Sequence, residues 1–171
     1  MAKNIKAEYV RGTEQCEVKN FVGLIRPMLY QADSNLVIET QQNVWYTNYC
    51  KYLSKPEPKQ MPYAVDILVS ENNIPRVIIE CKIKTYNTHS VIDYSEKAGC
   101  HKNVYPHLRY GFVVLNSIEK KFNRRYYEHA KNFDFEEMFT TTPSDKQLHL
   151  FVDKILAEVR SSREREKVFF G

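Results

Sequence analysis

The sequence lacks most of the features that would place it outside the ordinary globular proteins. Only 5 of its 171 residues are glycine, and it contains no low-complexity tract and no repeat of solenoid period. No apolar run reaches the roughly 18 residues that suggest a membrane-spanning helix, and the first residues lack the apolar segment of a secretory signal. We therefore expect a single domain over residues 1–171, located in the cytoplasm and without a membrane as partner.

Cysteine pairs and a strong charge imbalance are also absent. The four cysteines lie far apart and form no C-x-x-C pair, which argues against a zinc ribbon or a thioredoxin-type centre. With 25 basic and 21 acidic side chains the net charge is only +4, so nucleic-acid binding would depend on a local basic patch. The phosphate-binding motif G-x-x-x-x-G-K-[ST] is missing, which argues against an ATP-driven machine.

Hydrophobic periodicity predicts an α/β fold in the order α-β-β-β-α-β, followed by further helices. Pro27 favours a kink or an early end of the first helix. The expected elements are a helix over 13–31, a strand over 36–45, hairpin strands over 63–69 and 77–83, a helix over 90–102 capped by Ser90, a strand over 110–115, a helix over 118–130 and a last helix from Ser144. We expect a central mixed β-sheet flanked by helices, with a core over about residues 13–115 and helical additions over about 118–171.

Three charged residues interrupt the apolar strands of the predicted hairpin. Asp66 lies in the first strand, and Glu80 and Lys82 lie in the second. Because side chains alternate along a strand, Glu80 and Lys82 point to the same face, and pairing of the strands brings Asp66 close to Glu80. On a solvent-facing sheet these groups would form an ordinary ion pair worth under about 1 kcal/mol. The flanking runs are too apolar for such a strand, so we expect the three groups to form one site.

Two carboxylates on a half-buried sheet favour a divalent cation. Burying charged groups is costly unless they are paired or bind a metal, and adjacent carboxylates raise one another's pKa. Mg²⁺ removes both costs because it accepts carboxylate and carbonyl oxygens and keeps several waters. A metal-bound water is a better nucleophile, and the ion neutralises charge on a phosphate under attack. Lys82 is placed to hold or deprotonate the attacking water, or to stabilise that charge.

At these residues the sequence resembles the PD-(D/E)xK nuclease superfamily, which has a restriction endonuclease-like fold. The family motif is an acid at the end of one strand followed by [Asp/Glu]-x-Lys on the next, and Asp66 with the segment Glu80–Lys82 matches it. The resemblance extends to the α-β-β-β-α-β order over residues 13–115. One position departs from the pattern, because the proline before the acid is Val65 here and the nearest proline is Pro62.

The resemblance also implies a cofactor and further members of the site. It implies Mg²⁺, with Mn²⁺ as a substitute, bound by Asp66, Glu80 and the main-chain carbonyl of Cys81. It implies a catalytic glutamate from the first helix, which is Glu14 or Glu17 in this chain; we favour Glu17. An acid in the first turn also suits the positive end of the helix dipole without any catalytic role.

Residues able to contact DNA follow the motif. Chemistry on a sugar–phosphate backbone brings the chain beside the active-site strand close to the grooves, so this stretch is the favoured candidate. A second basic cluster over residues 120–125 is more typical of a solvated helix face. Lys97 is a further basic residue, on the helix predicted over 90–102. The residues expected to contact DNA are Lys84, Thr85, Tyr86, Asn87, His89, Lys102, Asn103 and Arg109.

Within the superfamily we favour a type II restriction endonuclease that cuts double-stranded DNA at a short specific sequence. The aromatic segment 45–55 and the residues after the core supply material for reading that sequence. One small site cuts one strand, so we expect a homodimer, with its surface on the first helix or on the apolar stripe Leu148–Val159. The alternatives are a junction-resolving or repair nuclease with the same site, and a catalytically inactive nucleic-acid-binding module, which the intact acidic motif disfavours.

Overall fold

A computed structural model describes residues 2–48 and 60–171 of the chain, with side chains over 14–45 and 62–171. The elements are α1 (Ala2–Ala32), β1 (Leu36–Asn48), β2 (Gln60–Glu71), β3 (Ile74–Ile83), α2 (Thr88–Val104), β4 (Arg109–Leu115), α3 (Arg124–His129), β5 (Phe135–Met138) and α4 (Asp145–Phe170). The first six elements confirm the predicted order. Most of the segment 45–55, expected to help read DNA, lies outside the described residues.

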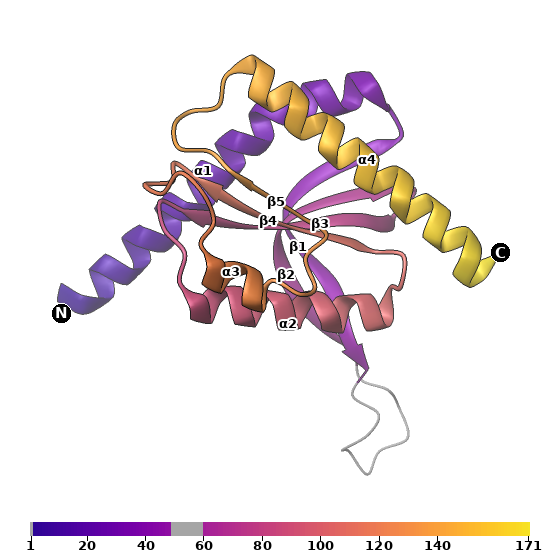
Figure 1. Cartoon of the computed structure of the whole chain (residues 1–171), viewed down its shortest axis with the longest axis horizontal. Helices are drawn as coiled ribbons and strands as arrows, with labels where there is room; N and C mark the ends of the chain where they lie inside the picture. The colour runs from indigo at the N-terminus through magenta and orange to yellow at the C-terminus, as the bar shows by residue number, and fades with distance from the viewer. Residues whose placement is uncertain (1, 49–59) are drawn as a thin grey trace, which may run out of the picture.

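Five strands form one mixed sheet in the order β1-β2-β3-β4-β5. β1, β2 and β3 pair antiparallel, whereas β4 and β5 add to β3 in parallel. The predicted hairpin is confirmed, and its turn contains Asn72 and Asn73 with φ of 51° and 64°, a region that asparagine tolerates better than most residues. The fold of the described residues is therefore α/β, with a five-stranded mixed sheet that lies between helices (Figure 1).

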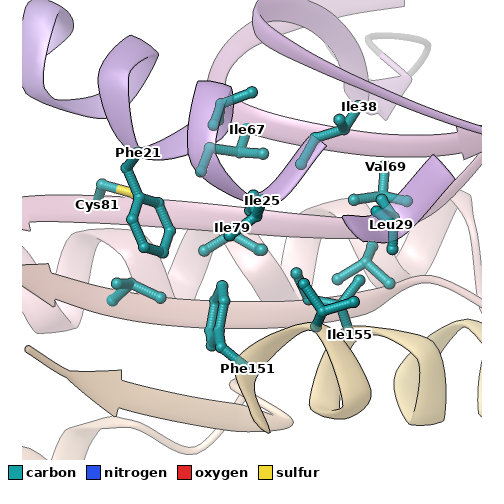
Figure 2. Close-up of a cluster of buried hydrophobic side chains, with 14 of the residues drawn as sticks. Phe21, Ile25, Leu29, Ile38, Ile67, Val69, Ile79, Cys81, Phe151 and Ile155 are labelled. Carbon is teal, nitrogen blue, oxygen red and sulfur yellow. The ribbon is translucent and has the colours of Figure 1, made fainter. Parts of the chain in front are cut away.

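The helices cover both faces of the sheet. α1 and α4 lie on one face, and α2 and α3 lie on the other (Figure 1). Figure 2 shows the first of these layers, where Phe21 and Ile25 of α1 and Phe151 of α4 pack against Ile79 and other sheet residues. The apolar stripe of α4 is buried in this layer, so it is core and is not available as a dimer surface. Within the described ranges, none of the helices could cross a membrane.

Two predicted helix boundaries in the first part of the chain differ from those observed. α1 begins at Ala2 instead of near residue 13, so Glu14 and Glu17 do not lie in its first turn, and it continues through Pro27 to Ala32. α2 begins at Thr88, because Asn87 rather than Ser90 is its cap: the Asn87 Oδ1 accepts from the Ser90 N–H at 2.8 Å. Ser90 completes this cap by accepting from the Asn87 N–H at 3.3 Å, and the helix passes Gly99 without ending.

The segment after β4 is less helical than its sequence suggests. The main-chain N–H groups of Ser117 and Ile118 donate to Phe139 and Lys84, so this stretch is tied to its neighbours instead of to its own helix. Only α3 remains helical, capped by Asn123. β5 was not predicted; its four residues, Phe-Glu-Glu-Met, are too short and polar to form an apolar strand pattern.

Candidate active site

β2 and β3 separate at one end of their hairpin, and we call this point the strand fork. Their pairing ends at Ile67↔Ile79; β2 then continues against β1, and β3 continues against β4. Asp66 and Glu80 are the next residues on the two strands, so they lie at the strand fork. The Cys81 N–H donates to the Asp66 Oδ2 at 2.9 Å, and a carboxylate thus satisfies a main-chain donor where the strands separate.

Glu80 is the buried acid of this pair. It is 1% exposed, and its Oε1 accepts from the Tyr110 hydroxyl at 2.8 Å. Burial, followed by the negative charge of Asp66, raises the pKa of Glu80 well above its usual value. The bond from Tyr110 and the positive charge of Lys97 act in the opposite direction. The surroundings therefore disfavour the charged form of Glu80, and a bound cation would favour it.

Lys82 lies on the same face of β3 as Glu80. The intervening Cys81 packs on the opposite face, in the core under α1 and α4. The Lys82 Nζ lies 3.3 Å from Glu14 Oε1 and 5.1 Å from the ring centroid of Tyr94. Its side chain is 23% exposed. The amine is thus held by both helix layers at the strand fork and stays accessible to a ligand.

The two candidate glutamates of α1 have different partners. Glu14 pairs with Lys82, as described above, whereas Glu17 accepts from the Asn116 Nδ2 at 3.2 Å after the end of β4. Residues three apart on a helix share a face, so spacing did not separate the two. The structure brings Glu14 to the site in place of the favoured Glu17.

A tyrosine–lysine group from β2 and α2 was not singled out from the sequence. The Lys97 Nζ donates to the Tyr63 hydroxyl and lies 3.7 Å from the Tyr63 ring centroid and 5.2 Å from that of Tyr94. Burial lowers the pKa of Lys97, and the negative charge of Glu80 opposes this effect. Tyr94 and Lys97 stand three residues apart on one helix face, but that spacing does not reveal that α2 covers the strand fork.

The donor atoms at the strand fork fit a hard divalent cation. Among the side chains that the structure describes, no group of three or more His, Cys, Asp or Glu residues is arranged to hold a metal ion. Mg²⁺ commonly binds only one or two carboxylates and keeps several waters, so the pair Asp66–Glu80 is a sufficient protein contribution. The enclosure of Glu80 beside Asp66 is the observation that favours a cation here, because two neighbouring carboxylates with little access to water are stabilised by a shared positive ion.

Five of the predicted DNA contacts lie beside the strand fork, four of them on the connection from β3 to α2 and His89 in the first turn of α2. Lys84 and Thr85 are exposed, and His89 is exposed with Asp93 3.5 Å away. Tyr86 and Asn87 have structural roles as well. The Tyr86 ring packs against Phe112, Phe122 and Tyr126 while its hydroxyl accepts from the Asn123 N–H at 3.0 Å, and Asn87 caps α2.

The other three predicted contacts lie far from the strand fork. Lys102 and Asn103 lie at the end of α2, and Arg109 lies at the start of β4. Lys102 pairs with Asp134 at 2.8 Å, and Arg109 pairs with Asp134 at 2.9 Å and with Glu158 at 2.6 Å. The charges of Lys102 and Arg109 are already compensated by acids of the same chain, and Asn103 lies beside Lys102 at the end of α2, so we leave the three residues out of the proposed DNA surface.

No known protein family and no curated protein sequence matches the chain. The candidate site is therefore defined by its own geometry. The site contains two adjacent carboxylates, whose oxygens are able to bind a cation, and two lysines from different elements, whose positive charge would favour an anion. This arrangement suits hydrolysis of a phosphate ester.

We expect His101, which supports this site, to make stability fall as the pH drops from 6.5 to 4. The ring is fully buried and stacks on Tyr110, the partner of Glu80. Burial lowers the pKa of His101 from 6.5 to about 4, so the folded protein keeps the ring neutral while the unfolded chain takes up a proton. The resulting loss is about 1 kcal/mol at about pH 5.5 and about 3 kcal/mol near pH 4.

Urea denaturation of the natural protein and of His101→Gln tests this expectation between about pH 7 and pH 4. Protonation of Glu80 has the opposite effect on the unfolding free energy, because its raised pKa stabilises the folded state as the pH falls. This effect is present in both proteins. The difference between the two proteins therefore isolates His101. A difference in unfolding free energy that stays constant over this range would contradict the assignment.

Proposed function

We propose that the protein is a metal-dependent endonuclease that hydrolyses DNA phosphodiester bonds at the strand fork. The observation that carries this proposal is the acid pair: Glu80 is enclosed beside Asp66, and Lys82 follows on the same face. Uncompensated buried charge destabilises a fold, so an acid pair retained in this position is best explained by a cation ligand. The mixed sheet and its element order are compatible with the restriction endonuclease-like fold that the sequence motif implies.

Each side chain of the site has a distinct proposed role. Asp66 and Glu80 would hold Mg²⁺ or Mn²⁺ together with the carbonyl of Cys81, and the bound ion would supply the acidity that activates water and neutralises the phosphate. Tyr110 orients Glu80 through its hydroxyl, and Glu14 restrains the Lys82 amine. Lys82 orients the attacking water or donates a hydrogen bond to a phosphate oxygen.

The proposed DNA path runs over the connection from β3 to α2. A surface cavity of ≈ 570 Å³ lies beside it between α2 and α3, and its lining includes Tyr86 and Asn87 from the connection and Arg124 and Arg125 from α3. Arg124 and Arg125 belong to the second basic cluster, which we expected from the sequence to be a solvated helix face. They thus lie next to the connection that contains exposed Lys84. Arginine binds phosphate oxygens in a bidentate manner, so this cavity suits the sugar–phosphate backbone near the cut.

We expect the protein to nick or linearise supercoiled plasmid in Mg²⁺ and to lose this activity in EDTA. The reason is that Asp66 and Glu80 on their own supply no activated water, whereas Lys82 alone supplies only charge. Mn²⁺ should restore cleavage, since it accepts the same oxygen ligands. Gel electrophoresis of the plasmid forms measures the outcome. Cleavage that persists in EDTA would contradict the proposal, and DNA binding without cleavage in either metal would indicate the inactive binding module.

Digestion of a long natural DNA distinguishes the finer alternatives. Discrete fragments, together with a dimer in sedimentation, would support a type II restriction endonuclease acting as a homodimer on a short palindrome. A smear from a monomer, or cleavage of branched DNA only, would assign the same active site to a repair or junction-resolving nuclease.

A further inference from the structure

Gln41 of β1 departs from regular strand geometry beside the strand fork. Its φ is 57°, in the left-handed region that residues other than glycine rarely adopt. The pairing of β1 with β2 passes from Thr40↔Ile67 to Gln42↔Val65, so Gln41 lies opposite Asp66. A strained backbone inside a paired strand persists only where its surroundings hold it, and such positions gather at functional sites.

The irregularity changes the face that each strand presents. Ile38 and Ile67 belong to the core under α1 and α4, whereas Val44 and Val65 belong to the core under α2. Ile38 and Val44 of β1 are an even number of positions apart, and so are Val65 and Ile67 of β2. In a regular strand the two residues of each pair would therefore share a face. Asp66 lies at this change of face, from which its carboxylate reaches the Cys81 N–H of the neighbouring strand.

Gln41 completes the restraint on this carboxylate. Its Nε2 donates to the Asp66 Oδ1 at 3.1 Å, while Oδ2 accepts from Cys81 at 2.9 Å. Donors on both oxygens fix the rotation of the carboxylate, and each oxygen keeps a further lone pair for another ligand. Gln41 is exposed, so its amide is able to bond to water instead. The bond to Asp66 is therefore not one that a buried amide would require for its own satisfaction.

We propose that Gln41 is a positioning residue that orients the Asp66 carboxylate for a divalent cation, and that the strained backbone of β1 is retained for this purpose. The inference rests on the proposed nuclease site. Groups that orient metal ligands commonly change metal affinity by about 10–100-fold when removed. Gln41 is expected to act within this range and without touching the DNA or the reacting atoms.

Two substitutions separate orientation from stability. Mn²⁺ titrated alone into the full chain, followed by calorimetry, should bind about tenfold more weakly to Gln41→Ala and to Gln41→Gly than to the natural protein. Asn43→Ala, which removes an exposed amide from the same strand, is the matched control and should bind Mn²⁺ as the natural protein does. Gln41→Gly should also melt at a higher temperature than Gln41→Ala, because glycine adopts positive φ without strain.

A structural role alone would leave Mn²⁺ affinity unchanged in both Gln41 variants, and that result would overturn the inference. Asp66→Asn identifies which proposal has failed. If Asp66→Asn binds Mn²⁺ as tightly as the natural protein, the metal site itself is refuted. If Asp66→Asn loses Mn²⁺ while both Gln41 variants keep it, the nuclease site stands and only the role of Gln41 is refuted.

Discussion

Replacement of Asp66 by Asn or Ala, or of Glu80 by Gln or Ala, is expected to abolish cleavage while the protein remains folded and still binds DNA. Each change removes one of the two carboxylates proposed to hold the cation, so the loss should exceed the roughly 10–100-fold that follows removal of a group behind a metal ligand. DNA binding should persist because the proposed phosphate and base contacts lie on the connection from β3 to α2.

Glu80→Gln should also be no less stable than the natural protein when metal is absent. Glutamine keeps an oxygen able to accept from the Tyr110 hydroxyl, and it removes a charge whose burial beside Asp66 is unfavourable. Plasmid nicking, mobility shifts with DNA and thermal melts measure the three properties. Glu96→Gln, at an exposed position of α2, is the matched control and should change none of them. Parallel loss of folding and DNA binding in the variants at the strand fork would instead assign the acid pair a structural role.

Lys82→Met is expected to slow cleavage by about 10²–10³-fold without loss of Mn²⁺ binding. The size of the effect follows from the place of Lys82, two residues after Glu80 on the same face of β3, where a positive group that stabilises charge in the transition state typically contributes this much. The Lys82 amine, which methionine lacks, lies 5.1 Å from the Tyr94 ring centroid, but methionine retains much of the apolar stem of lysine, so the packing between β3 and α2 should change little.

Lys97→Met is the informative comparison, because it removes a second positive charge from the surroundings of the same acids. If both lysines act only by lowering the negative potential at the strand fork, the two variants will lose similar activity. If Lys82 contacts the attacking water or the phosphate, Lys82→Met will lose far more. Rates at saturating Mn²⁺ distinguish these outcomes, and a rate for Lys82→Met close to that of the natural protein would remove Lys82 from the mechanism.

The order of elements and the central hairpin could be predicted from the sequence because both depend on local patterns. Short apolar runs identify β2 and β3, and the alternation of side chains along a strand places Glu80 and Lys82 on one face. The apolar stripe of α4 and its cap at Ser144 are equally local signals, and both appear as expected. What these patterns specify is which residues share a face of one element.

The partners of those residues depend on tertiary packing. Buried Glu80 accepts a hydrogen bond from Tyr110, thirty residues later in the chain. Lys82 pairs with Glu14 of α1, whereas Glu17 of the same helix bonds to Asn116. Arg109 is neutralised by acids that follow it far along the chain, and the turned backbone of Gln41 opposite Asp66 leaves no local signal. Contacts between distant segments set the burial and electrostatic potential at each charge, and no periodicity within a single segment encodes them.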